Sequence, residues 1–381
     1  TEITVNENFE NFTVAIGQNQ DYLELTDVDP DQPESESYDL WVAGKQVTET
    51  NQNDVLDNGT VSYDPNTHTL TLNDAHLTLD ENAEKGIYCC IDSKLTEALT
   101  ITGKGAMRNY GGSKEMPWFQ YADKIKSVTL EDGLTNVGSF AFNSMPNLEV
   151  VNIPASVTKI GDYSFKNCTK LSTLNLSEGL KSIGESAFYG CSALSSITMP
   201  DSLTTVGTYV FKGCTGLTNV KLSNSLTRIS ESLFYGCTSL TSVSIPEGVK
   251  YVDGYVFKNC ANLADVSLPE SLTKLGESAF YGCKKLTTIV IPKNVPTIGS
   301  YTFKACTALA DVTLPDNLKA IGESAFYGCT ALQKLTIPSK TTTINDYAFK
   351  NCTGLTAVEL PASLTKIGES AFYASKLATL T

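Results

Sequence analysis

Residues 240–262 read LTSVSIPEGVKYVDGYVFKNCAN, and close variants of this stretch fill the chain from about residue 124 onward. Its most regular position is a phenylalanine that recurs every 23 residues, without insertion or deletion. The phenylalanines in this register are Phe142, Phe165, Phe188, Phe211, Phe234, Phe257, Phe280, Phe303, Phe326, Phe349 and Phe372. So regular a period predicts that successive segments fold as similar coils, which stack to share one core.

Apolar and turn residues keep the same places inside each coil. Inward apolar side chains in residues 240–246 predict one strand, which ends at Pro246 because proline cannot continue ladder pairing. A second extended segment, LKSIG at 180–184, carries further inward apolar residues and ends in a glycine that permits a turn. The segment ESAFYGC at 185–191 indicates a short helical turn, with its phenylalanine and cysteine three apart on one face. Each coil is therefore expected to have two extended segments and one helical turn.

Nine of the eleven cysteines lie 23 residues apart. They are Cys168, Cys191, Cys214, Cys237, Cys260, Cys283, Cys306, Cys329 and Cys352. Stacked coils place them roughly 5 Å apart, but with parallel Cα–Cβ directions that suit a disulfide poorly. We therefore expect a ladder of free, buried thiols, and no metal ligand set, because no histidine or CxxC motif accompanies them. The other two, Cys89 and Cys90, are adjacent, and a disulfide between them would be strained.

Alternate coils differ, so the repeating unit is 46 residues long. One coil type has tyrosine two before the phenylalanine and lysine directly after it, as at Tyr255 and Lys258. The other has glutamate three before and tyrosine directly after, as at Glu277 and Tyr281. The alternation separates like charges that would otherwise stack roughly 5 Å apart, and it allows Glu–Lys pairs between coils. Relief of this repulsion explains the pattern; a functional tyrosine stripe is the alternative.

The consensus LxxVx(I/L)PxxLxxIGxxxFxxCxx resembles the BspA-type leucine-rich repeat of bacterial cell-surface proteins. The resemblance covers about two thirds of the chain, with (I/L)P, IG, AF and C recurring in register. It implies a mainly β fold with short helical turns: a right-handed leucine-rich-repeat solenoid at 121–381, of about 11 repeats, preceded by a small all-β domain. It also implies an extracellular protein without catalytic activity that binds host matrix, host cells or other bacteria.

The first part of the chain has a different texture. Residues 1–37 form an acidic segment or linker, and short alternating runs separated by turn signals predict a small all-β module at 38–120. These runs resemble a module of secreted bacterial repeat proteins that is sometimes labelled carbohydrate-binding. Tyr38, Trp41 and Trp118 are candidate sugar platforms in such a module. Trp118 also lies where the open end of the first coil needs a cover.

Charge divides the chain where the repeats begin. Residues 1–120 carry 22 acidic and 6 basic side chains, whereas residues 121–381 carry 20 acidic and 22 basic ones. The acidic first part argues against nucleic acid, whose phosphates require a basic patch. No apolar run is long enough to predict a membrane span. The chain opens at Thr1 with neither Met nor a basic-then-apolar leader; we expect an extracellular or cell-surface protein whose signal peptide has been removed.

The sequence contains no recognisable catalytic set. The repeats have no histidine, so neither a Ser-His-Asp nor a Cys-His arrangement can form in them, and GxSxG, phosphate-loop and HExxH motifs are absent. His68 and His76 lack a third metal ligand. Asp27, Asp29 and Asp31 begin like a calcium loop without its glycine and closing glutamate. We therefore predict no enzyme, no metal site and no cofactor.

Binding residues are sought among exceptions to the repeat and among exposed aromatics. The outward positions of the main strand are mostly small and hydroxylated, without the aromatics that protein hot spots favour. The candidate surface comprises Asp265, Asp311, Lys221 and Lys334 on that face, and the tyrosines Tyr189, Tyr235, Tyr281 and Tyr327. Two hypotheses follow: a protein partner on a host or bacterial surface binds the solenoid, or a glycan binds the first module.

Overall fold

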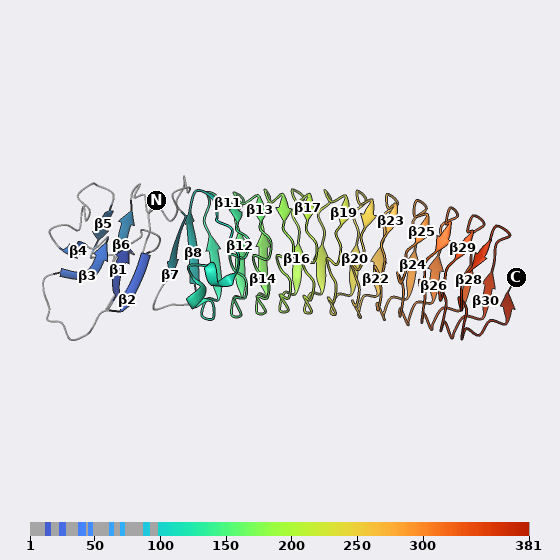
Figure 1. Ribbon diagram of the computed structural model, residues 1–381. Coiled ribbons are helices and arrows are strands. Elements are labelled where there is room, and N and C mark those ends of the chain that lie inside the picture. The colour runs from blue at the N-terminus through green and yellow to red at the C-terminus, as the bar shows by residue number, and fades with distance from the viewer. Residues whose placement is uncertain are drawn as a thin grey trace.

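The computed structural model describes seven strands in the first part of the chain and every residue from 98 to 380 (Figure 1). The seven strands are β1 (Phe12–Ile16), β2 (Leu23–Asp27), β3 (Ser37–Val42), β4 (Lys45–Thr48), β5 (Val61–Asp64), β6 (Thr69–Leu72) and β7 (Ile87–Ile91). The first six form three antiparallel hairpins, β1–β2, β3–β4 and β5–β6. Our predictions for His68, His76, Asp29 and Asp31, and for the side chains of Asp27, Cys89 and Cys90, lie outside the described residues.

From residue 98 onward the chain winds as a solenoid with two parallel sheets, the main sheet and the second sheet (Figure 1). The main-sheet strands are β8 (Ala98–Gly103), β10 (Ser127–Leu130), β12 (Val150–Ile153), β14 (Thr173–Leu176), β16 (Ser196–Thr198), β18 (Asn219–Lys221), β20 (Ser242–Ser244), β22 (Asp265–Ser267), β24 (Thr288–Val290), β26 (Asp311–Thr313), β28 (Lys334–Thr336), β30 (Ala357–Glu359) and β32 (Thr379–Leu380). The second-sheet strands are β9 (Gly105–Ala106), β11 (Leu134–Val137), β13 (Lys159–Ile160), β15 (Ser182–Ile183), β17 (Thr205–Val206), β19 (Arg228–Ile229), β21 (Tyr251–Val252), β23 (Lys274–Leu275), β25 (Thr297–Ile298), β27 (Ala320–Ile321), β29 (Thr343–Ile344) and β31 (Lys366–Ile367). From β10 to β31 paired residues are 23 apart, as Val150 and Thr173 are, which confirms the predicted coil.

The 46-residue unit is visible in the main sheet. From β16 onward the pairings form successive twos, β16–β18, β20–β22 and β24–β26, before β28–β30. The central valines of β18, β22 and β26 are partly exposed, whereas the central residues of β16, β20 and β24 are buried. Two kinds of coil therefore alternate in backbone pairing as well as in sequence.

The third side of each coil differs from the expectation of a helical turn. Residues 185–190 form successive turns, and two residues per coil have left-handed backbone, Ser186 (φ 52°) and Gly190 (φ 74°) in this one. The amide groups of Ser186, Phe188 and Gly190 donate to carbonyls of the next coil at 2.8–3.1 Å. A helix would direct these amides along its own axis. Hydrogen bonding between coils therefore replaces the helical turn, and it gives the solenoid a third ladder.

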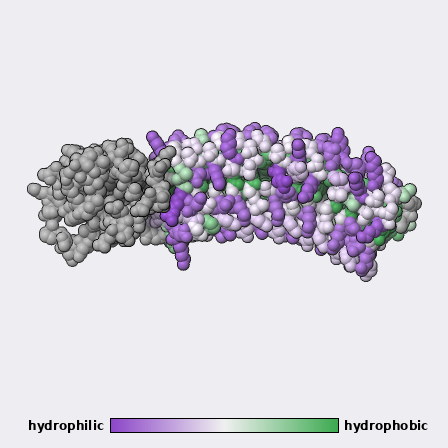
Figure 2. All heavy atoms as spheres, turned by 45° about the horizontal axis from the view of Figure 1, so that its top comes forward, coloured by the Kyte–Doolittle hydropathy of each residue, from purple (hydrophilic) through white to green (hydrophobic). Residues whose placement is uncertain are grey.

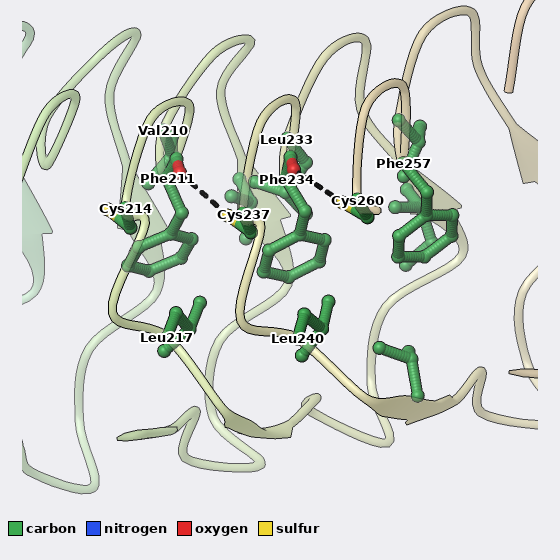
Figure 3. Packing of buried hydrophobic residues seen from close by; sticks show 14 of the residues in the cluster. Val210, Phe211, Cys214, Leu217, Leu233, Phe234, Cys237, Leu240, Phe257 and Cys260 are labelled. Carbon is green, nitrogen blue, oxygen red and sulfur yellow. Dashed lines mark hydrogen bonds between the residues drawn. The ribbon is translucent and has the colours of Figure 1, made fainter. Parts of the chain in front are cut away.

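Phenylalanine rings form a continuous stack through the core. Phe234 and Phe257 are 5.8 Å apart between ring centroids with an interplanar angle of 8° (Figure 3). Phe257 and Phe280 are 5.3 Å apart. Both rings of each pair are buried. Such aromatic pairs contribute about 0.5–1.5 kcal/mol beyond the area that they bury. The stack is therefore the main apolar link between one coil and the next.

The repeated cysteines are free and buried, as expected. Each thiol donates to the carbonyl of the phenylalanine 26 residues earlier, as from Cys260 Sγ to Phe234 O at 3.0 Å and from Cys237 Sγ to Phe211 O at 3.2 Å (Figure 3). Burial raises the pKa of the Cys260 thiol to about 12, although backbone hydrogen bonds act in the opposite direction. The ladder therefore satisfies backbone carbonyls of the solenoid and holds its protons strongly.

This burial predicts that the nine thiols do not react in the folded protein. A pKa of about 12 lowers the thiolate fraction at pH 8 by roughly a thousandfold relative to an ordinary thiol. In a Cys89→Ser/Cys90→Ser variant, Ellman's reagent is expected to label no thiol before unfolding and all nine in guanidinium chloride without reductant. Labelling of the native protein, or a smaller final count, would contradict the free and buried ladder.

The solenoid sheets begin before the first regular repeat. β8 pairs in parallel with β10, and β9 with β11, so residues 98–106 form the first layer of both sheets. This layer lies within the range that the sequence analysis assigned to the small β module. Leu99 and Val128 face each other at a spacing of 29 rather than 23, because the short 3₁₀ helices η1 (Ser113–Glu115) and η2 (Phe119–Tyr121) intervene. Antiparallel β7 then covers the outer edge of β8.

Candidate functional site: a tyrosine–lysine ladder

The edge between the second sheet and the thiols carries one tyrosine per coil. In the coil of Phe257, the preceding Tyr255 has left-handed backbone (φ 61°), and in the next coil Tyr281 follows Phe280. Phe257 and Phe280 are fully buried, whereas both tyrosines are partly exposed. Together with one lysine per 46 residues they form the tyrosine–lysine ladder. Its members are Tyr163, Lys166, Tyr189, Tyr209, Lys212, Tyr235, Tyr255, Lys258, Tyr281, Tyr301, Lys304, Tyr327, Tyr347, Lys350 and Tyr373.

Each interior lysine of the ladder lies among three tyrosine rings. Lys258 Nζ is 5.7 Å from the ring centroid of Tyr235, 5.1 Å from that of Tyr255 and 4.8 Å from that of Tyr281. Lys212 and Lys304 have the same three neighbours in their own coils, at 4.7 to 5.7 Å. An ammonium within about 6 Å of an aromatic face is attracted by the ring. These contacts hold lysines and tyrosines in one extended array.

In every second coil a glutamate lies three residues before the phenylalanine, as Glu277 does, and we call these the ladder glutamates. They pair with tyrosine rather than with lysine. Tyr255 Oη donates to Glu277 Oε1 at 3.0 Å, and the equivalent bond from Tyr163 to Glu185 is 2.6 Å. Hydrogen bonding to Glu277 and partial burial raise the pKa of the Tyr255 phenol. The expected Glu–Lys pairing is wrong for the ladder: the ion pairs between described residues are Arg228–Asp253 and Lys293–Glu270, and neither involves a lysine of the ladder. The lysines lie over aromatic rings instead, so tyrosines, and not ion pairs, contact both the lysines and the glutamates.

This arrangement makes the ladder a firm but accessible surface. Nine of its ten tyrosines are half-buried, and Tyr373 is 62% exposed. Tyrosine offers a large contact area with few rotatable bonds, and here ring contacts and hydroxyl bonds already restrict it. The outer ring edges and the carboxylates of the glutamates remain available to a partner. Tyr189, Tyr235, Tyr281 and Tyr327, which the sequence singled out, thus lie together in one array.

The outward face of the main sheet does not assemble a comparable site. Asp265, Asp311, Lys221 and Lys334 are all exposed there but lie on four different strands, β22, β26, β18 and β28. Lys221 lies in a shallow hollow of about 310 Å³ across β16, β18 and β20, whose other polar lining is serine, threonine and asparagine. In the view of Figure 2, hydrophilic and intermediate residues make up most of the described surface, with hydrophobic ones scattered among them. The outward positions of the main-sheet strands carry no aromatic residue, so this face lacks aromatic anchors, as the sequence predicted.

Trp118 covers the end of the core and is not a sugar platform. Its side chain is only 3% exposed, and its ring stacks on Phe142 with centroids 5.4 Å apart. Tyr110 packs edge-on against the Trp118 ring, and the Trp118 indole N–H donates to Ala141 O at 2.8 Å. No ring face remains for a sugar. Tyr38 and Trp41 lie on β3, and because their side chains are outside the described part, their sugar-binding role stays a prediction.

The repeats match a known protein family. The model of the BspA-type leucine-rich repeat region matches in six copies, over residues 115–216, 181–306 and 273–381. The chain belongs to the BspA-type leucine-rich repeat family. This BspA-type protein is therefore a leucine-rich-repeat scaffold of the bacterial surface type. Among curated proteins no match was found.

Similar solved structures include two bacterial leucine-rich repeat proteins. A leucine-rich repeat protein from Bacteroides ovatus is 28% identical with a TM-score of 0.50, over 76% of this chain and 90% of that one. A leucine-rich cell surface protein from Faecalibacterium prausnitzii is 27% identical with a TM-score of 0.49, over 77% and 92%. The Bacteroides ovatus protein supports the solenoid fold at a level of identity that also supports common ancestry.

Two further observations concern the described part of this BspA-type protein. No helix there has the length and apolar character that crossing a bilayer requires. Within the same residues, no three histidine, cysteine, aspartate or glutamate side chains are grouped to hold a metal ion.

The ladder lysines were missing from the predicted binding surface. Their fixed place directly after Phe in every second coil was the signal, but their aromatic neighbours come from three coils and follow only from stacking.

Proposed function

We propose that this protein is a non-catalytic, cell-surface interaction protein that binds a protein partner along the tyrosine–lysine ladder. The observation that supports this proposal is the ladder itself, with ten tyrosines held in one array by lysines and glutamates. Tyrosine is enriched at protein interfaces and among the residues that contribute most to affinity. Because ring contacts and hydroxyl hydrogen bonds already restrict these side chains, less side-chain entropy is lost when a partner docks.

The dimensions of the ladder suit a protein rather than a small molecule. Ten coils with strands spaced about 4.8 Å apart give a length of roughly 43 Å. A typical protein interface buries about 800 Å² on each partner, which an edge of this length can supply. Membership of the BspA-type family supports a partner that is a protein of the host or of another bacterium.

Removal of ladder rings is expected to weaken binding to such partners. The probes are an immobilised basement-membrane matrix and washed whole bacterial cells, with the full chain in solution. The triple variant Tyr235→Ala/Tyr281→Ala/Tyr327→Ala should bind at least about tenfold more weakly, since each interfacial tyrosine can contribute more than 1 kcal/mol. The triple Tyr→Phe variant at the same positions should bind nearly as well, because its ring faces remain.

A control separates the ladder from the main-sheet face. Asp265→Asn/Asp311→Asn/Lys334→Gln changes exposed charges of that face and should leave binding unchanged. If this variant loses binding while the tyrosine variant keeps it, the main-sheet face is the binding surface and the proposal is wrong. All variants should first be compared by thermal unfolding, so that a loss of fold is not mistaken for a loss of contact.

A further inference from the structure

The outward side of the second sheet, which the proposed function does not use, carries charge of one sign. Each of ten coils presents two consecutive residues there, from Thr158 and Lys159 to Thr365 and Lys366. These positions contain no acidic residue, and most of the uncharged ones are threonine or serine. The cations, all exposed, are Lys159, Lys181, Arg228, Lys250, Lys274, Lys319 and Lys366. We call these ten residue pairs the cationic stripe.

The cations of the stripe are arranged so that neighbours do not stack directly. Arg228 is paired in register with Tyr251, and Tyr251 with Lys274, whereas Lys250 lies in the adjacent column. Lys159 and Lys181 are offset in the same way, since Lys159 is in register with Ser182. Like charges directly opposite each other on a sheet are destabilising. Staggering reduces that cost while the stripe remains positive, in a chain whose net charge is −14.

Carboxylates border the stripe but do not neutralise it. The turns that precede the second-sheet strands carry exposed Glu178, Asp201, Glu247 and Glu270, and the ladder glutamates follow the strands. One carboxylate does reach a cation of the stripe: Arg228 Nη1 lies 2.9 Å from Asp253 Oδ1. The positive surface is thus only two residues wide on each coil and about 43 Å long over ten coils. A double-stranded nucleic acid presents phosphates across a much wider surface than this.

The neighbours of the cations favour a hydrophilic ligand. Tyr251, 37% exposed and lying 4.8 Å below the Arg228 guanidinium, is the only aromatic residue of the stripe. Peptide and protein ligands usually need buried apolar or aromatic anchors, which this face does not offer. Threonine hydroxyls beside the cations donate to backbone carbonyls of the preceding coil, as Thr273 Oγ1 does to Lys250 O at 3.0 Å. Their oxygens can still accept hydrogen bonds from sugar hydroxyls. Arginine and lysine bind oxyanions through charge-assisted hydrogen bonds.

We propose that the cationic stripe binds a linear sulfated polysaccharide along the axis of the solenoid. Arg228, Lys250 and Lys274 occupy three successive coils, so the ligand must present an anionic group at nearly every step. A sulfated polymer has this charge density, whereas a polymer with one carboxylate on every second sugar has less. The site uses none of the residues of the tyrosine–lysine ladder.

Binding to immobilised heparin, measured with the full chain at several salt concentrations, tests this site. We expect saturable binding that weakens steeply with salt, because counterions are released from the polyanion. The variant Arg228→Gln/Lys250→Gln/Lys274→Gln should bind about tenfold more weakly, given the modest contribution of each exposed charge pair. The matched control Lys170→Gln/Lys284→Gln/Lys285→Gln removes three exposed charges from another side of the coil and should retain heparin binding.

The remaining outcomes decide between this ligand and others. Equal binding to hyaluronate, to polyglutamate or to duplex DNA of matched concentration would overturn the assignment to a sulfated polysaccharide. Equal losses in the two triple variants would show that only net charge matters, and no loss in either would place heparin binding elsewhere, for example in the first module. Loss of heparin binding with intact binding to the matrix in heparin-free buffer would show that the stripe and the ladder act independently.

Discussion

At pH 10 the solenoid is expected to unfold at a far lower urea concentration than at pH 8. Five buried thiols, those of Cys168, Cys214, Cys260, Cys306 and Cys352, have pKa values that burial raises from 9.0 to about 12. Below pH 9 both states keep these protons, and the folded state has its full stability. Between pH 9 and 12 the unfolded chain releases them and the folded chain does not, so the free energy of unfolding falls as pH rises.

The size of this effect is large because it is repeated. A shift of this kind costs about 1.4 kcal/mol per thiol at pH 10. Five such thiols amount to about 7 kcal/mol, within the range of about 5–15 kcal/mol that is typical of a whole domain. Urea unfolding followed by circular dichroism at pH 8, 9 and 10 measures it. A midpoint that does not change over this range would contradict the buried thiol ladder.

A cysteine variant isolates the cause. Cys214→Ala/Cys260→Ala should lower stability at pH 8 through the cavities that it creates. Its further loss between pH 8 and 10 should nevertheless be smaller than that of the parent by about 3 kcal/mol, the share of two thiols. The control Tyr255→Phe/Tyr301→Phe removes two phenols whose pKa values are also raised, by hydrogen bonds to Glu277 and Glu323. A pH dependence reduced only by the phenylalanine variant would assign it to the ladder tyrosines instead.

Truncation of a central ring of the phenylalanine stack is expected to be the most destabilising single substitution considered. Phe257 is fully buried and stacks on Phe234 and on Phe280. Phe257→Ala should lower the free energy of unfolding by about 3–5 kcal/mol, because it removes buried apolar area and leaves a cavity. In a solenoid each coil contacts only its neighbours, so the cavity also interrupts the link between the two halves.

The last ring of the stack provides a matched control. Phe372 is only partly buried and stacks on Phe349 alone among the described rings. Phe372→Ala makes the same chemical change and should cost less than half as much. Guanidinium chloride unfolding of both variants and the parent gives the comparison. Equal losses in the two variants would show that stacking on both sides does not determine the contribution of a ring.

The stacked fold could be predicted because every coil repeats the same pattern of apolar residues. With a 23-residue period, each coil can bury its inward apolar residues by stacking against the next coil. The free thiols followed from the same register. The first layer, β8 and β9, was not predicted as part of the solenoid. The segment that contains η1 and η2 increases the distance along the chain between paired residues of β8 and β10 from 23 to 29 residues. Periodicity identifies only elements that keep the period.

Details that depend on neighbouring coils were less accessible. Residues 185–191 have the spacing of a helical turn, yet their amide groups find carbonyls in the next coil, and this satisfies the backbone without a helix. The glutamates and lysines have the spacing of ion pairs between coils, yet Glu277 accepts from Tyr255 and Lys258 lies over the rings of Tyr255 and Tyr281. In both cases the spacing along one chain allowed more than one partner, and stacking of the coils selected between them.

The sequence by itself determined the coil, its length, the inward residues and the two-coil unit, since these follow from side-chain type and spacing along one chain. Only the tertiary structure decided which side chains share a surface. It brought three tyrosines around Lys258, and it buried Trp118 against Phe142. It also joined scattered lysines into a stripe without acidic residues. The physical reason is that these arrangements are made between residues about 23 or 46 positions apart, which become neighbours only when the coils stack.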